Sequence, residues 1–232
     1  LIDVAVIFNE PNMYTFLAYI KGDLPPHGFL SIKHMRRAQA VIDEAIAAAR
    51  DVLKSYGLKA TFAHSYSKFE SRSPVFKPAV YYLNRQNSKY LEMFREMDYA
   101  GVNFYVVGRY DDFALRFVLR PEALLEVKTP RPLAVTEFGV ASRNEEFRYR
   151  YLCAMANVFK KAKPVVAIWW SLLHGYEWGL GYQPFFALID VRGTKRLVTP
   201  LARRFREILL SPHPCDLGEV EMGLEWRWEP PG

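Results

Sequence analysis

Short apolar runs alternate along the chain with longer stretches in which apolar residues recur at helical spacing. The runs begin near residues 3, 58, 99, 132 and 165, and each is typical of a parallel strand that is buried on both faces. Helical spacing follows at about Lys33 to Tyr56, Tyr81 to Glu96, Asn144 to Ala162 and Leu201 to Leu209. The alternation predicts an α/β fold made of five strand-helix units.

Local signals place the boundaries of several segments. Ser31 precedes the first long helix and is expected to cap its amino terminus, and Gly57 follows its last turn. The apolar face of that helix should pack on the sheet. A loop that contains Pro25 to Gly28 is expected between the end of the first strand, at Phe8, and the first long helix. Further loops are expected over Ser71 to Pro78 and over His174 to Pro184, and a short helix over Pro121 to Lys128.

Two of the predicted strands end in a glutamate. The stretch from Arg131 to Gly139 delivers Glu137 after a short apolar run, and the stretch from Asp3 to Pro11 delivers Glu10 in the same way. In α/β folds the loops at the carboxyl ends of the strands line a shared crevice, so the two carboxylates are predicted to form an acid and nucleophile pair. Either glutamate taken alone could equally be the partner in a loop salt bridge.

Composition narrows the class of protein. With 232 residues, 50% of them hydrophobic, the chain can bury a large core, and we expect one domain over residues 1–232 with a carboxyl-terminal tail at 211–232. The net charge of +6 is dispersed, without the basic stripe of a nucleic-acid-binding surface. The longest apolar run, Pro164 to Leu173, is about half of the ~20 residues that a membrane-spanning helix needs. Neither a nucleic acid nor a membrane is therefore expected as a partner.

The chain has two cysteines, and neither has the spacing of a metal ligand. Cys153 falls within a helical pattern, and Cys215 lies in the tail. We expect free thiols in a reducing compartment, which favours a cytoplasmic protein. No metal ion and no cofactor are expected.

Four motifs occur in a fixed order along the chain. They are Asn9-Glu10-Pro11-Asn12, Gly101-Val102-Asn103-Phe104-Tyr105, Thr136-Glu137-Phe138-Gly139, and the stretch from Trp170 to Trp178. In order and spacing they resemble the motifs of glycoside hydrolase family 1, and most closely its archaeal β-glycosidase branch. The resemblance extends to about Leu210 and implies a (β/α)₈ TIM barrel that is partial, with about strands four to eight present.

The resemblance implies roles for the two glutamates. Glu10 would be the general acid and base, and Glu137 the nucleophile of a double displacement that retains the anomeric configuration. Such a mechanism demands carboxyl groups ~5 Å apart and pKa values that differ, with the acid raised and the nucleophile ionised. Tyr105 would hydrogen-bond Glu137 and help to keep it anionic, and Asn103 would support the pair.

The resemblance also implies a sugar site. Asn9 would meet the sugar 2-hydroxyl, Trp170 and Trp178 would offer apolar faces to the ring, and Phe186 would line the same site. Glu177 would accept hydrogen bonds from the outer hydroxyls and would repel a phosphate, which favours an unphosphorylated sugar. The implied activity is that of a retaining β-glycosidase of the β-glucosidase or β-galactosidase type.

Several residues depart from the family pattern or have simpler interpretations. Phe138 replaces the usual Asn, and His174-Gly175 and Phe185-Phe186-Ala187 replace Asp-Asn and Arg-Phe-Gly. Trp169 is expected in the core because strand neighbours face opposite ways. His64 either lines the pocket or serves a loop, and the tandem Trp226 and Trp228 favour packing or a subunit contact.

Three hypotheses stay open at this point. The family's remaining sugar contacts, a Gln near the first strand and a His-Trp pair after the third, have no counterparts in this chain. The chain is either a β-glycosidase whose other strands lie upstream of Leu1 or on a separate polypeptide, or a non-catalytic remnant of one, or a related retaining hydrolase of polysaccharides. Expected partners are a small β-glycoside or an oligosaccharide, together with a homo-oligomer or an amino-terminal half-barrel.

Overall fold

A five-stranded parallel sheet forms the centre of the protein. The computed structural model describes residues 2–111, 114–178, 180–210 and 220–222. Neighbouring strands pair in the order β1-β2-β4-β7-β8, and every pair is parallel. The strands are β1 (Val4–Asn9), β2 (Lys59–Tyr66), β4 (Ala100–Phe104), β7 (Leu133–Phe138) and β8 (Val166–Trp169). All five predicted strands are therefore confirmed.

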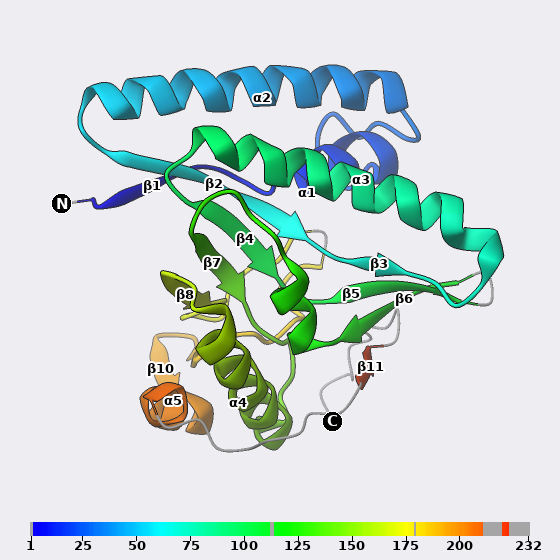
Figure 1. The fold of residues 1–232 in the computed structure, drawn as a ribbon. Coiled ribbons are helices and arrows are strands. Elements are labelled where there is room, and N and C mark those ends of the chain that lie inside the picture. Colours follow the sequence, from blue (N-terminus) through cyan, green and yellow to red (C-terminus); the bar gives the residue numbers. More distant parts are fainter. Residues whose placement is uncertain (1, 112–113, 179, 211–219, 223–232) are drawn as a thin grey trace.

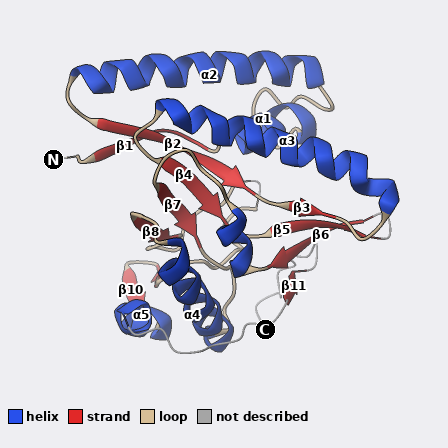
Figure 2. Ribbon diagram, in the orientation of Figure 1, coloured by secondary structure: helices blue, strands red, loops and turns tan. Residues whose placement is uncertain are grey.

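The helices flank this sheet. In Figure 1, α2 runs beside β1 and β2 and α3 beside β2, whereas α4 and α5 gather beside β7 and β8. Figure 2 shows the same layers by type of structure. The helices are α1 (Pro11–Phe16), continued by a π-helical turn (Leu17–Lys21), α2 (Ile32–Ser55), α3 (Lys77–Met93), continued by a 3-10 turn (Phe94–Glu96), α4 (Glu145–Ala162) and α5 (Pro200–Leu210). The long predicted helices are confirmed, and α1 replaces part of a predicted loop because Pro11 suits the first turn of a helix.

The amino termini of α2 and α4 differ in whether a side chain caps them. Ser31 occupies the cap position of α2, but its hydroxyl contacts the carbonyl oxygen of Phe29 at 3.4 Å and makes no bond to the helix. The predicted cap at Ser31 is therefore wrong. Asn144 does cap α4, because its side-chain oxygen accepts from the backbone N–H of Phe147 at 3.0 Å.

A second sheet extends from the carboxyl end of the first. It has the order β11-β6-β5-β3, and the sequence did not predict its central hairpin. Charged residues such as Arg109 interrupt the apolar alternation there, and they are satisfied only in the folded sheet, where Arg109 and Arg120 both pair with Glu70 at 2.8 Å. The remaining short elements are β3 (Phe69–Glu70), a 3-10 turn (Pro74–Phe76), β5 (Val107–Asp111), β6 (Ala114–Leu119), a 3-10 helix (Pro121–Glu126), β9 (Ile189–Arg192), β10 (Lys195–Val198) and β11 (Val220–Met222).

Aromatic rings fill the core between the sheet and the helices. Phe62 of β2 stacks on Phe94 with ring centroids 4.4 Å apart. Phe138 of β7 meets Phe159 of α4 and Trp169 of β8 edge to face, at 4.9 and 5.4 Å. Phe138 is fully buried and Trp169 nearly so, which confirms the core position of Trp169. The phenylalanine that replaces the family's asparagine thus serves packing.

The expectation of free thiols is wrong for Cys153, which is disulfide-bonded. Cys215 lies outside the described residues. Whether a cysteine is disulfide-bonded depends on tertiary structure that residue spacing alone does not contain. The argument for a reducing compartment from cysteine usage therefore loses its support. Within the described ranges, no helix combines the length and the apolar character needed to cross a bilayer.

The parallel sheet is open, as five strands of an eight-stranded barrel require. β1 and β8 are its two edges. Apolar side chains on both edges meet solvent, with Val6 of β1 exposed by 48% and Ile168 of β8 by 50%. Unpaired strand edges with apolar side chains are templates for association with further strands.

We predict that Gly101→Ala destabilises the fold strongly. A Cβ atom at Gly101 would collide with the backbone carbonyl of Phe62 on the neighbouring strand, and backbone cannot yield as a flexible side chain can. The free energy of unfolding should fall by about 3 kcal/mol, measured by denaturant titration. Gly175→Ala is the matched control, since its Cβ would have no neighbour closer than 3.9 Å. Equal stability of the two variants would contradict this account of Gly101.

We also predict that residues 1–232 produced alone associate through the sheet edges. Ile168→Lys places a charge on the β8 edge and should shift the species seen by light scattering towards smaller mass. Val52→Lys is the control, because Val52 is similarly exposed, by 57%, but lies on α2. If both substitutions changed the mass equally, general solubility rather than edge pairing would explain the association.

Candidate active site

Glu10 is held in an unusual backbone conformation directly after β1. Its φ of 50° and ψ of 57° lie in the left-handed region, which non-glycine residues rarely occupy. Its N–H donates to the carbonyl of Ala63 on β2 at 2.7 Å. Asn12 reinforces this turn, because its amide exchanges hydrogen bonds with the backbone of Ser65 at 2.8 and 3.3 Å. The strand end and the start of α1 are thereby fixed to β2.

The amide of Asn103 connects the ends of three strands. Its nitrogen donates to Asn9 Oδ1 at 3.0 Å and to Glu10 Oε1 at 2.9 Å, both at the end of β1. Its oxygen accepts from the hydroxyl of Thr136 on β7 at 2.7 Å. Asn103 is 1% exposed, so these bonds supply the partners that a buried amide needs.

Glu137 lies on β7, opposite Asn103 in the sheet register. The hydroxyl of Tyr105 donates to Glu137 Oε2 at 2.7 Å, as the resemblance implied. The Tyr105 ring in turn meets the edge of the Phe186 ring, with centroids 5.9 Å apart and planes inclined by 70°. The predicted nucleophile therefore sits between a buried amide and a partly buried phenol.

Trp170 and Glu177 form a second group of predicted site residues. The indole nitrogen of Trp170 donates to Glu177 Oε1 at 2.9 Å. Backbone hydrogen bonds between Glu177 and Gly181 shape the turn that carries the carboxylate. Trp178 lies beside it and is 41% exposed. Gly139, at the end of β7, approaches the carbonyl of Trp170 so closely that a Cβ atom would collide with it.

The electrostatics differ from the expectation for the nucleophile. The pKa of Glu137 is raised to about 7. Burial is the largest cause, and the charges of Glu10 and Glu177 act in the same direction, whereas hydrogen bonds from Tyr105 and Asn103 lower the pKa. The expected fully ionised Glu137 is thus not what this environment gives. Burial also raises the pKa of Glu10, opposed by hydrogen bonds to Asn103 and Ser65. Burial is the largest cause of both shifts.

The structure brings most of the predicted residues together. Direct contacts join Asn9, Glu10, Asn103, Tyr105, Glu137 and Phe186, and one hydrogen bond joins Trp170 to Glu177. His64 belongs to neither group, because it is 1% exposed and bonds Asn87 of α3 at 3.1 Å. The second interpretation of His64, as a residue that satisfies local structure, is the better one. The predicted Trp226 and Trp228 lie outside the described residues.

Sequence reasoning missed three residues that support the site. Asn12 could have been found, since it belongs to the same motif as Glu10 and amides often bond to backbone in turns. Ser65, whose contacts hold Asn12 and Glu10, carries no signal in the sequence. Arg148 is a third, and its partners become visible only in three dimensions.

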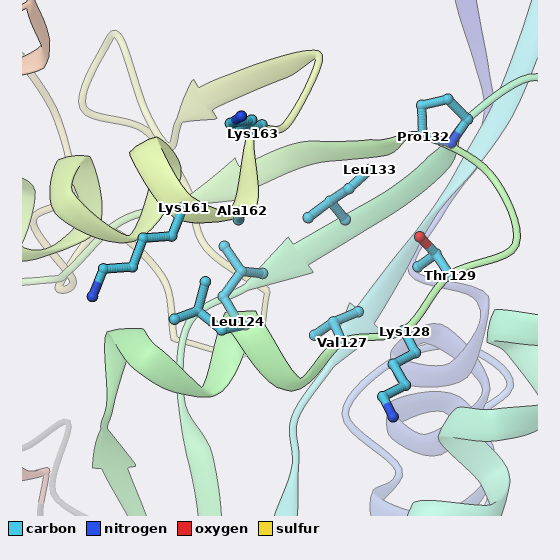
Figure 3. Close-up of a pocket in the computed structure, with 10 residues that line it drawn as sticks. Leu124, Val127, Lys128, Thr129, Pro132, Leu133, Lys161, Ala162 and Lys163 are labelled. Atoms are coloured by element: carbon cyan, nitrogen blue, oxygen red, sulfur yellow. The ribbon is translucent and has the colours of Figure 1, made fainter.

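A separate pocket of about 510 Å³ lies at the opposite end of the sheet. Figure 3 shows it between the start of β7, the end of α4 and the segment near Val127. Its lining includes Leu124, Leu133 and three lysines, but none of the predicted site residues. In (β/α) barrels this end contributes to stability, whereas chemistry occurs at the carboxyl ends of the strands. We therefore place the candidate site at the carboxylates.

We predict opposite effects of two substitutions on the titration of Glu137. Tyr105→Phe removes a hydrogen bond that lowers the pKa and should raise it above about 7 by about one unit. Glu10→Gln removes a negative charge that raises the pKa and should lower it. The measurement is carbon-13 NMR of glutamate carboxyl groups, with Glu137→Gln identifying the resonance. A shift of the same sign in both variants would refute the assigned contacts.

Comparisons with known proteins agree with this geometry at the level of the fold. No protein-family model matches the chain. The chloroplastic galactolipid galactosyltransferase SFR2 of Arabidopsis thaliana is 24% identical over an alignment of 254 positions, gaps included, which covers 88% of this chain and 39% of that protein. The alignment thus spans well under half of this relative.

Solved β-glucosidase structures match over a similar extent. The β-glucosidase of Pyrococcus furiosus is 23% identical with a TM-score of 0.78, covering 92% of this chain and 55% of that one. The β-glycosidase of Thermosphaera aggregans is 24% identical with a TM-score of 0.73, covering 90% and 55%. The β-glucosidase of Thermotoga maritima is 23% identical with a TM-score of 0.70, covering 88% and 62%. This chain therefore has the fold of the glycoside hydrolase family 1 β-glucosidases over little more than half of their length, as a partial (β/α)₈ barrel.

Proposed function

We propose that this chain carries the catalytic carboxylates of a retaining β-glycosidase that acts on unphosphorylated sugars. Glu10 is the general acid and base, and Glu137 is the nucleophile. The observation that supports this most is the pair of strand-end carboxylates around one buried amide, with Tyr105 donating to Glu137 at 2.7 Å. A phenol donor at that oxygen stabilises the ionised form that a nucleophile requires.

The reaction proceeds in two displacements. A carboxylate oxygen of Glu137 attacks the anomeric carbon, the bond to the leaving oxygen breaks, and the proton of Glu10 passes to that oxygen. Glu10, now ionised, takes a proton from water, whose oxygen attacks the same carbon and releases Glu137. Two inversions give net retention of the β configuration.

The sugar lies between the carboxylates and the two tryptophans in this proposal. Asn9 contacts the 2-hydroxyl, Trp170 and Trp178 pack on the ring, and Phe186 closes the far side. The bond from Trp170 holds Glu177 at 2.9 Å, so that its other oxygen can accept from outer hydroxyls. Burial raises the pKa of Glu177, yet a carboxylate there still disfavours a phosphorylated sugar.

Efficient catalysis requires further strands against β1 and β8. We propose that these strands complete a single barrel domain, either on the same polypeptide or as an amino-terminal half-barrel partner. They would supply hydroxyl contacts that this chain does not, and a deficit of about 4 kcal/mol in the transition state slows turnover about a thousandfold. If the completed barrel is also inactive, the chain is a non-catalytic remnant.

A second candidate activity is glycosyl transfer to another sugar. The Arabidopsis relative is a galactolipid galactosyltransferase, and a glycosyl-enzyme on Glu137 can be attacked by a sugar hydroxyl as well as by water. Apolar side chains surround the Glu177 turn and are exposed: Leu172, Leu173, Tyr176, Leu180 and Tyr182. Such a rim suits an apolar aglycone and favours testing a glycolipid as donor and acceptor.

The cellular location stays a prediction. We propose the cytoplasm, as for an archaeal enzyme of this kind. The disulfide at Cys153 is compatible with it if the source is hyperthermophilic, because intracellular proteins of such organisms are an exception to the rarity of cytosolic disulfides.

The stereochemistry of the product tests the function. Once the barrel is completed by its further strands, proton NMR of the fresh product of an aryl β-glucoside or β-galactoside should show the β-anomer first. An initial α-anomer would refute double displacement, and a galactolipid yielding oligogalactolipids in place of free sugar would favour the transfer activity.

Chemical rescue tests the two roles. Glu137→Gly should abolish turnover, and azide should restore it with an α-glycosyl azide as product, because the anion fills the vacated space and attacks directly. Glu10→Gly is the matched variant and should give the β-azide with an activated substrate. Exchange of these two products would reverse the assignment of nucleophile and acid.

A further inference from the structure

A buried arginine on α4 has no role in the proposed reaction. Arg148 has no exposed surface, although its charge would be costly to bury without partners. One terminal nitrogen donates to Glu145 Oε1 at 2.6 Å. The guanidinium also lies near two rings, with its central carbon 5.1 Å from the Phe185 ring centroid and 5.9 Å from that of Trp169.

The second terminal nitrogen of Arg148 binds the segment that carries Phe186. It donates to the carbonyl of Phe186 at 3.0 Å and to the carbonyl of Ala187. The indole nitrogen of Trp169 donates to the same Phe186 carbonyl at 2.9 Å. Both peptide groups are therefore fixed by donors from α4 and β8 rather than by neighbours within their own loop.

Glu145 extends this connection to a third element. Its second carboxylate oxygen accepts from the backbone N–H of Leu201 at 2.9 Å, in the first turn of α5. The ion pair of Arg148 and Glu145 thus holds α4, α5 and the 185–187 segment together.

The Phe186 ring connects the 185–187 segment to the carboxylate of Glu137. It packs against the Tyr105 ring, and Tyr105 donates to Glu137. We propose that Arg148 is a positioning residue of the active site, which clamps the Phe186 and Ala187 carbonyls and so keeps the Tyr105 hydroxyl aligned on Glu137. This rests on the proposed function only for the catalytic role of Glu137.

A purely structural role of Arg148 would lower stability without touching Glu137 in particular. The test therefore measures the pKa of Glu137 by carbon-13 NMR in the full-length protein without substrate. Arg148→Lys keeps the positive charge, but lysine lacks the planar guanidinium fork with which arginine binds Glu145 and both carbonyls at once. It should raise the pKa of Glu137 by up to about one unit, the effect of weakening one hydrogen bond to a carboxylate.

A double substitution tests whether Arg148 acts on Glu137 through the Tyr105 hydroxyl. In a Tyr105→Phe background Arg148→Lys should cause no further rise, because the hydroxyl through which it acts is gone. An equal rise in both backgrounds, or a fall, would overturn the proposal. Arg150→Lys, a charge-conserving exchange at an exposed position of the same helix, should leave the pKa unchanged.

Phe186→Leu tests the same connection if the Arg148→Lys variant does not fold. It leaves the backbone carbonyls and their bonds to Arg148 in place but removes the ring that packs on Tyr105. The pKa of Glu137 should rise, and an unchanged value would overturn the proposal. These titrations need no turnover, so a completed barrel that is inactive would refute the proposed function, while the expected shifts would leave the positioning role of Arg148 standing.

Discussion

The hydrogen bonds of the Asn103 amide depend on the register of the parallel sheet. Its two N–H groups and its oxygen are all engaged, with Asn9, Glu10 and Thr136. These partners come from β1 and β7, which are not neighbours of one another in the sheet. A slip of one residue in β4 would turn the amide to the other face and separate the two carboxylates. Register is therefore a functional constraint as well as a structural one.

Burial of several carboxylates together has an energetic consequence. The pKa of Glu137 is raised to about 7 against an ordinary value of 4.5, so the folded state favours its protonated form. Such a group stabilises the fold fully below pH 4.5, and this contribution is lost as pH rises through about 7. Active sites that bury several carboxylates lower the stability of the fold in return for reactive groups. Further strands on β1 and β8 would change the burial of these carboxylates and therefore their pKa values.

The parallel sheet and the two carboxylates could be predicted from the sequence, but the environment of the carboxylates could not. Apolar runs located β7 and β1 because buried parallel strands need uniform side chains, and the motifs located Glu10, Tyr105 and Glu137. The β5–β6 hairpin was missed because charged residues such as Arg109 interrupt its apolar pattern, and Arg109 meets its partner Glu70 only in the folded sheet. The bonds of Arg148 were invisible for a similar reason, since it and Phe186 are 38 residues apart. The pKa of Glu137 depends on burial, which no local pattern encodes.

The close approach of Gly139 to Trp170 has a consequence for the geometry of the proposed site. Because no side chain separates these two backbones, the ends of β7 and β8 are in direct contact. The proposed nucleophile and the proposed sugar platform therefore belong to one rigid body. The geometry between the proposed nucleophile and the proposed sugar platform is therefore set by contact between backbones rather than by side-chain packing.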